Sequence, residues 1–116
     1  MDAQTAFEQK DNCVFLDVRE PYEWDAGHID GSIHIPITQL PARTDEVPSD
    51  QTVVVVCQVG QRSDLAARFL RERGYDAHNL EGGMSTWQAQ ALPFVTTQGE
   101  NGAVLDGYAR DFDGLL

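Results

Sequence analysis

The segment that most restricts the fold is the run VVVVC, residues 53–57. Consecutive β-branched residues without polar alternation predict a strand that is buried on both faces. A strand of this kind lies in the middle of a parallel sheet that is covered by helices. The next residues, CQVGQRS at 57–63, lead directly into a predicted helix, so the strand and the helix are joined by a short loop.

The rest of the chain alternates between short strands and helices. Strands are predicted within 13–18, 32–36 and 75–83, and helices within 2–9, 20–27, 38–47, 62–73 and 84–91. In the 62–73 helix, Leu65, Ala66, Phe69 and Leu70 share one face, and Gly74 provides a left-handed stop. Alternating strands and helices indicate an α/β layer structure.

Size and charge exclude several classes of protein. A chain of 116 residues with 41% hydrophobic content suits one domain. The net charge of −11 and a single lysine, Lys10, argue against binding to nucleic acid or to an acidic membrane. We find neither a signal sequence nor an apolar run of about 20 residues, so we expect a cytoplasmic protein. Two cysteines without CxxC spacing, and scattered histidines, predict no disulfide, metal or cofactor.

The loop that follows the valine run has features of an anion-binding site. Cys57 stands at the carboxyl end of the strand, where α/β sheets form their sites. A tight turn and the following helix N-terminus would direct backbone N–H groups at the sulfur and favour its nucleophilic thiolate. Gly60 suits a positive φ, and Arg62 adds a cation. A buried, inert thiol is the alternative interpretation of Cys57.

Three separated stretches resemble the signatures of single-domain rhodaneses, a family of sulfurtransferases. They are LDVREPYEWDAGHIDGSIHIP at 16–36, CQVGQRS at 57–63 and LEGGMSTWQAQALP at 80–93. The resemblance implies a three-layer α/β/α rhodanese-like domain with a mainly parallel central sheet over residues 1–95. Residues 96–116 are predicted to be an acidic, glycine-containing tail, which could dock on the domain, join two subunits in a homodimer or be loosely ordered.

By this resemblance, Cys57 accepts a sulfane sulfur from thiosulfate or a persulfide and passes it to a thiophilic acceptor such as cyanide or a thiol. The donor is a small molecule or a protein. The residues expected to hold the transferred sulfur are Gln58, Val59, Gly60, Gln61 and Arg62. Arg62 would also orient an anionic donor. The loop has less positive charge than is common in the family, because Gln58 and Gln61 are neutral.

Other polar residues have structural alternatives. The resemblance places Asp17 and Arg19 beside the active loop, but the two could simply form an ion pair that joins loops. Ser63, next to the loop, could instead cap the helix, as could Asp64. We expect His28 to fix a turn through a hydrogen bond rather than act as a base.

Three residues are predicted to have packing roles. Trp24 and Trp87 are expected to pack in the core or at its rim rather than stack on a substrate. Cys13 has no partner that would make it a resolving thiol, so we expect a small buried residue.

Two other functions remain open at this stage. Cysteine-based phosphatases and arsenate reductases typically place the arginine one residue later, as C-x5-R, whereas four residues separate Cys57 from Arg62 here. The shorter loop suits a sulfur atom better than a phosphate group. The other alternative is a module that carries sulfur or binds a partner without rapid turnover.

Overall fold

A computed structural model describes residues 1–96, and the elements below belong to that range. The α-helices are α1 (Ala3–Glu8), α2 (Pro21–Ala26), α3 (Leu40–Arg43), α4 (Gln61–Arg71) and α5 (Gly83–Ala89). The strands are β1 (Cys13–Asp17), β2 (Ile33–His34), β3 (Thr52–Val56) and β4 (Ala77–Asn79). Short 3₁₀ helices occupy Lys10–Asn12, Ile37–Gln39 and Thr44–Glu46. Except for Thr96, the predicted tail and its docking or dimer contacts lie outside the described residues.

The valine run forms an inner strand of a parallel sheet, as its composition predicts. Within residues 1–96 the sheet has four strands in the order β2-β1-β3-β4, and each neighbouring pair is parallel. Strand β3 pairs with β1 through Leu16 and Val55, and with β4 through Val54 and His78. Its valines, 53–56, are all buried. The expected α/β fold with a parallel sheet is therefore confirmed.

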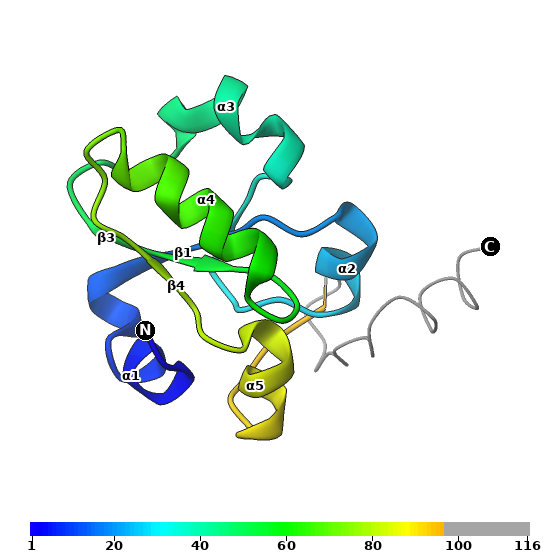
Figure 1. Cartoon of the computed structure of the whole chain (residues 1–116). Helices are drawn as coiled ribbons and strands as arrows, with labels where there is room; N and C mark the ends of the chain where they lie inside the picture. The colour runs from blue at the N-terminus through cyan, green and yellow to red at the C-terminus, as the bar shows by residue number, and fades with distance from the viewer. Residues whose placement is uncertain (97–116) are drawn as a thin grey trace.

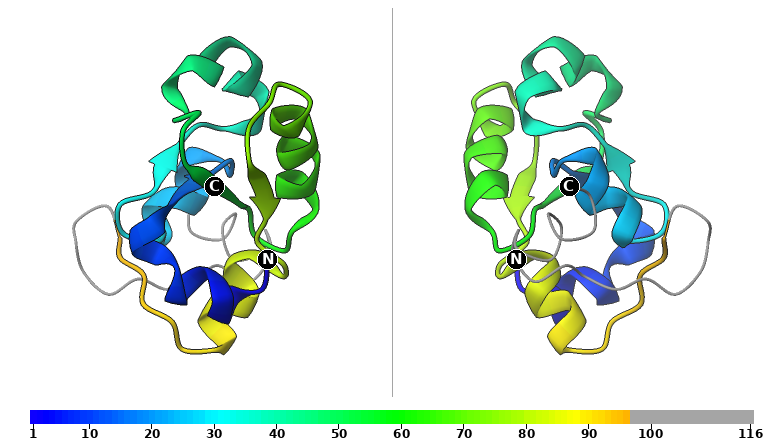
Figure 2. Two further views of the ribbon diagram at one scale, coloured as in Figure 1. Left: turned by 90° about the vertical axis from the view of Figure 1, so that its left-hand side faces the viewer. Right: turned by 90° about the vertical axis from the view of Figure 1, so that its right-hand side faces the viewer.

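Helices cover both faces of the sheet, which gives three layers (Figures 1 and 2). On one face, Val53 and Val55 pack with residues of α3 and α4, including Leu40 and Leu70. On the other face, Phe15, Val54 and Val56 pack with α1 and α5, including Ala6, Met84 and Trp87. Successive side chains of a strand point to opposite faces, so one uninterrupted apolar strand supplies both cores.

Local sequence explains how the helices near the loop begin. Helix α2 has Pro21 in its first turn, and Glu20 and Glu23 form a reciprocal capping box. Helix α4 begins after Gly60, whose φ of +106° is accessible mainly to glycine. Helix α2 follows β1 and α4 follows β3, and these strands are parallel neighbours, so the first turns of both helices lie at the same edge of the sheet.

The buried face of α4 differs from the predicted one. The residues that α4 buries are Ser63, Ala66, Ala67 and Leu70. Leu65 is 61% exposed, so its predicted place on the inner face is wrong. These four residues are spaced i, i+3, i+4 and i+7, which is the spacing of one helix face. That face includes Ser63 and does not include Leu65. Gly74, with a φ of +88°, follows the helix as predicted.

The segment after α5 returns across the domain. The indole Nε1–H of Trp87 donates to the carbonyl of Pro93 at 2.8 Å, and Val95 exchanges backbone hydrogen bonds with His28. Trp87 is buried, with edge-to-face contacts to Phe7 and Phe15, which confirms its packing role. Among residues 1–96, no helix has the length and apolar character needed to span a bilayer.

Candidate active site

Cys57 lies immediately after β3, and its side chain is fully buried. The backbone N–H of Gly60 donates to Sγ at 3.0 Å, and Ser63 Oγ lies 3.2 Å from Sγ. Because α4 begins at Gln61, its N-terminal dipole adds positive potential in the same region. A backbone N–H donor and a helix N-terminus make this end of β3 suited to an anionic group.

Helix α5 fixes the backbone direction of the loop. The N–H of Met84 donates to the carbonyl of Cys57 at 2.9 Å, and the N–H of Ser85 donates to the carbonyl of Gln58 at 3.0 Å. In a trans peptide the N–H points opposite to the carbonyl. The N–H groups of Gln58 and Val59 therefore point away from α5.

Gly83 makes the close contact between α5 and the loop possible. Its φ is +59°, and a Cβ atom at this position would lie 2.4 Å from the carbonyl oxygen of Cys57. The same atom would lie 2.6 Å from the backbone of Gln58. Any side chain at position 83 would push the loop away from the helix that holds it.

A buried arginine connects the first strand to the loop. Arg19 Nη2 lies 2.8 Å from Asp17 Oδ2, and Arg19 Nε donates to both carboxylate oxygens at 3.0 and 3.1 Å. The same guanidinium donates to the Gly27 carbonyl at 2.6 Å and to Gln58 Oε1 at 3.2 Å. Gln58 Nε2 donates onward to Ser85 Oγ. This network joins β1, the end of α2, the loop and α5.

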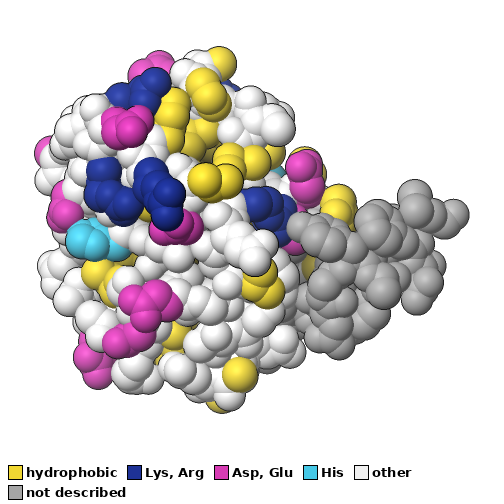
Figure 3. Space-filling model, in the orientation of Figure 1, with side chains coloured by type: hydrophobic (Ala, Val, Ile, Leu, Met, Phe, Trp, Pro, Cys, Tyr) yellow, Lys and Arg dark blue, Asp and Glu magenta, His cyan; other side chains and the backbone are white. Residues whose placement is uncertain are grey.

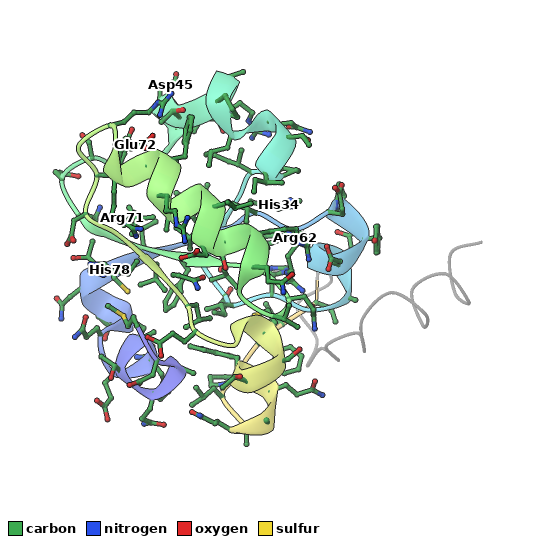
Figure 4. The ribbon with its side chains drawn as sticks, viewed as in Figure 1. His34, Asp45, Arg62, Arg71, Glu72 and His78 are labelled. Atoms are coloured by element: carbon green, nitrogen blue, oxygen red, sulfur yellow. The ribbon has the colours of Figure 1, made fainter. Side chains whose placement is uncertain are left out.

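Arg62, predicted to orient an anionic donor, is bound to a carboxylate of the protein itself. Its Nη1 and Nη2 donate to Glu23 Oε1 and Oε2 at 2.8 and 2.9 Å, which is bidentate geometry. The Glu23 side chain is 1% exposed and that of Arg62 is 25% exposed. Figure 4 shows Arg62 at the start of α4, on the side that faces α2. Sequence reasoning missed Glu23, because residues 23 and 62 meet only through the fold.

Ser63 contacts the sulfur directly, beyond the capping role that the sequence also allowed. Its Oγ lies within hydrogen-bond distance of both Cys57 Sγ and Asn79 Oδ1, which share its one proton, and its side chain is fully buried. Asn79 Nδ2 donates to the Gly60 carbonyl at 3.1 Å. Asn79 at the end of β4 is thus a second residue that the sequence interpretation missed. Its place at the end of a strand adjacent to β3 was the available signal.

The other predicted loop residues differ in accessibility. Gln58 is buried within the network of Arg19, whereas Val59 is 56% exposed and Gln61 is exposed. The structure thus places Asp17, Arg19 and Ser63 around the loop of residues 57–62. Their parts in a reaction stay predictions.

The residues predicted to have structural roles lie beside the site or away from it. His28 Nδ1 is 2.8 Å from the carbonyl of Trp24, which confirms the expected hydrogen bond. The Trp24 ring stacks on His28 at 3.5 Å and on His34 at 4.7 Å between centroids. The sequence predicts a buried Cys13, but the residue is half-buried. It is the first residue of β1 and lies at the edge of the sheet opposite to Cys57. Partial burial raises the pKa of the Cys13 thiol.

Comparisons with known proteins agree with this arrangement. The family model described as the rhodanese-like domain matches residues 2–90. A sulfurtransferase from Allochromatium vinosum is 34% identical over 90 residues, which cover 77% of this chain and 84% of that protein. A putative sulfur carrier protein, YrkF of Bacillus subtilis, is 34% identical, and the match covers 71% of this chain but only 47% of the carrier. The crystal structure of a rhodanese-related protein from Thermoplasma volcanium superposes with a TM-score of 0.80 at 35% identity, covering 82% and 95% of the two chains.

Proposed function

The chain belongs to the rhodanese-like domain family, and on this premise we propose that it is a sulfurtransferase that carries sulfur as a persulfide on Cys57. The observation that carries the proposal is the position of Cys57 Sγ, which accepts a hydrogen bond from the Gly60 N–H at the start of α4 and lies 3.2 Å from Ser63 Oγ. The Gly60 N–H and the helix N-terminus can stabilise negative charge on sulfur during its transfer, and a thiolate is the form that attacks a sulfane sulfur.

The proposed reaction has two half-reactions. The Cys57 thiolate attacks the sulfane sulfur of the donor, a sulfur–sulfur bond forms, and the rest of the donor leaves with the electron pair of the broken bond. An acceptor such as cyanide or a thiolate then attacks the outer sulfur, and the Cys57 thiolate is released. The loop amides of residues 58–62 stabilise the charge on the outer sulfur.

The surroundings of the loop keep it in position through both steps. Arg19 holds Gln58, and the first turn of α5 holds the carbonyls of Cys57 and Gln58. Because these groups are bound before any donor arrives, little reorganisation is needed when the sulfur becomes charged. We assign Asp17, Arg19 and Ser63 to this positioning role.

Steady-state sulfur transfer from thiosulfate to cyanide tests the proposal. Cys57→Ser should abolish thiocyanate formation, whereas the matched variant Cys13→Ser should retain it, because Cys13 pairs with Thr52 at the start of β3 and Cys57 follows the end of β3. Activity that survives in Cys57→Ser would refute the proposed nucleophile. A second candidate function, sulfur carriage without rapid turnover, is favoured by the full burial of Cys57. In that case stoichiometric sulfur uptake from a protein persulfide would be much faster than turnover with thiosulfate.

A further inference from the structure

The charges around the loop cancel in pairs. Arg19 and Arg62 both reach the loop, and each is held by a buried carboxylate, Asp17 in the first case and Glu23 in the second. The formal charge of these four side chains therefore sums to zero. The Gly60 amide and the start of α4 remain as sources of positive potential.

Glu23 is well placed to offset the attraction of Arg62 for an anion. The carboxylate is almost completely buried, so water screens it little, and it engages the guanidinium through two hydrogen bonds. An anionic donor approaching Cys57 would meet an arginine whose charge is already compensated. The charge of the whole chain, −11, adds repulsion rather than attraction.

The other described arginines on the face that carries α3 and α4 are paired with carboxylates or lie at or beyond the C-terminal end of α4, where Arg71 and Arg73 donate to the carbonyls of Ala77 and Phe69. On the face that carries α3 and α4, basic side chains lie beside acidic ones (Figure 3). Arg68 pairs with Asp64 at 2.9 Å, and Arg43 pairs with Glu46 at 2.8 Å. A dianion is therefore attracted weakly over this face, whereas a donor with little charge is not penalised.

We infer that Glu23 sets the donor specificity of the proposed site, by compensating Arg62 so that thiol persulfides are preferred over dianionic thiosulfate. The inference rests on the proposed sulfurtransferase function. With thiosulfate, Cys57 takes the sulfane sulfur and sulfite leaves with the electron pair. With a thiol persulfide, RS–SH, the Cys57 thiolate attacks the terminal sulfur, RS⁻ leaves, and the proton stays on Cys57–S–SH. Only the first donor brings two negative charges to the loop.

The test compares two donors in the full-length chain, with cyanide as acceptor. The probes are thiosulfate and the persulfide of 2-mercaptoethanol, which has no charge outside its reacting sulfurs. Glu23→Gln keeps the shape and an acceptor for the Glu20 N–H but removes the negative charge. At short range in a partly buried site, one unit charge changes anion binding by about tenfold or more. We expect thiosulfate kcat/KM to rise by about tenfold, mainly through KM, with less than about twofold change for the persulfide.

A second variant assigns the gain to Arg62. In Glu23→Gln/Arg62→Gln the thiosulfate gain should disappear, because the uncovered cation is gone. The double variant is used in place of Arg62→Gln alone, because that single change would leave the Glu23 carboxylate buried without its partner. The matched control is Glu46→Gln, which removes a carboxylate from a surface pair with Arg43 and should leave both donors unchanged.

Several results would overturn the inference. One is an equal change for both donors in Glu23→Gln, and another is a thiosulfate gain that persists in the double variant. Sulfate titration of the Gly60 amide signal by NMR gives a readout without turnover, and unchanged sulfate affinity in Glu23→Gln would also overturn it. Failure of the proposed function looks different, since neither donor would then load Cys57 in the unmodified protein.

Discussion

Arg19 is the residue whose replacement should damage the domain most through a single lost side chain. Its guanidinium is 1% exposed, as is the Asp17 carboxylate, and it also bonds Gly27 and Gln58. Arg19→Met leaves the Asp17 charge buried without its partner. Breaking a buried pair in this way costs about 3–5 kcal/mol, a large share of the roughly 5–15 kcal/mol that stabilises a domain.

This cost translates into a measurable fall in melting temperature. At about 4 °C or more per kcal/mol for a domain of this size, Arg19→Met should lower Tm by at least roughly 12 °C. The assay is thermal unfolding followed by circular dichroism near neutral pH. Asp17→Asn/Arg19→Met should recover part of the loss, since no buried charge is left. The matched control, Arg43→Met, breaks a half-exposed pair with Glu46 and should cost about 1 kcal/mol or less. The reasoning fails if Arg19→Met is no more destabilising than Arg43→Met.

Three further predictions concern the loop and the sheet edge. Gly83→Ala should slow sulfur transfer more than about tenfold, because the added Cβ would clash with the Cys57 carbonyl. A tenfold change in rate corresponds to about 1.4 kcal/mol in the activation free energy. Ser63→Ala removes a hydrogen bond to the reacting sulfur and should slow single-turnover persulfide formation by about tenfold. Thr52→Val should raise the pKa of Asp76, which the Thr52 hydroxyl, and secondarily His78, hold below its usual value. Carbon-13 NMR of the carboxyl group measures this change.

The controls for these predictions follow from the same geometry. Gly74 has a φ of +88°, but a Cβ atom added there would have no heavy atom within 4 Å. Gly74→Ala should therefore cost about 1–2 kcal/mol of stability and leave sulfur transfer intact. Equal loss of transfer in both glycine variants would contradict the role of Gly83. Because the pKa of Asp76 is lowered, its stabilising contribution is present above its unfolded pKa and is lost as pH falls through its folded pKa. Thr52→Val should therefore reduce this acid-side loss, and an unchanged Asp76 titration would contradict the assignment.

The fold can be predicted from the sequence because the most apolar segment, the valine run 53–56, forms the inner strand around which both cores are built. An inner strand of four valines requires helices on both faces, and the positive φ angles expected at Gly60 and Gly74 are confirmed. The inner face of α4 is harder to predict. Ser63 is polar and looks exposed in the sequence, but its hydroxyl is satisfied by Cys57 and Asn79, and so it is buried while Leu65 is not.

The site is less predictable than the fold for a similar reason. Cys57 and its loop are contiguous in sequence, so their position at the end of β3 can be anticipated. The pairing of Glu23 with Arg62 spans 39 residues and depends on how α2 packs beside the start of α4. No local pattern encodes this contact, yet it decides whether the arginine of the loop is available to an anionic donor.

The most direct test of the central claim is the mass of the intact protein after exposure to a sulfane donor, followed by peptide mapping. We predict the gain of one sulfur atom on Cys57, its removal by cyanide, and no gain in Cys57→Ser. Addition of sulfur to Cys57→Ser, or its location on Cys13 in the unmodified protein, would contradict the account.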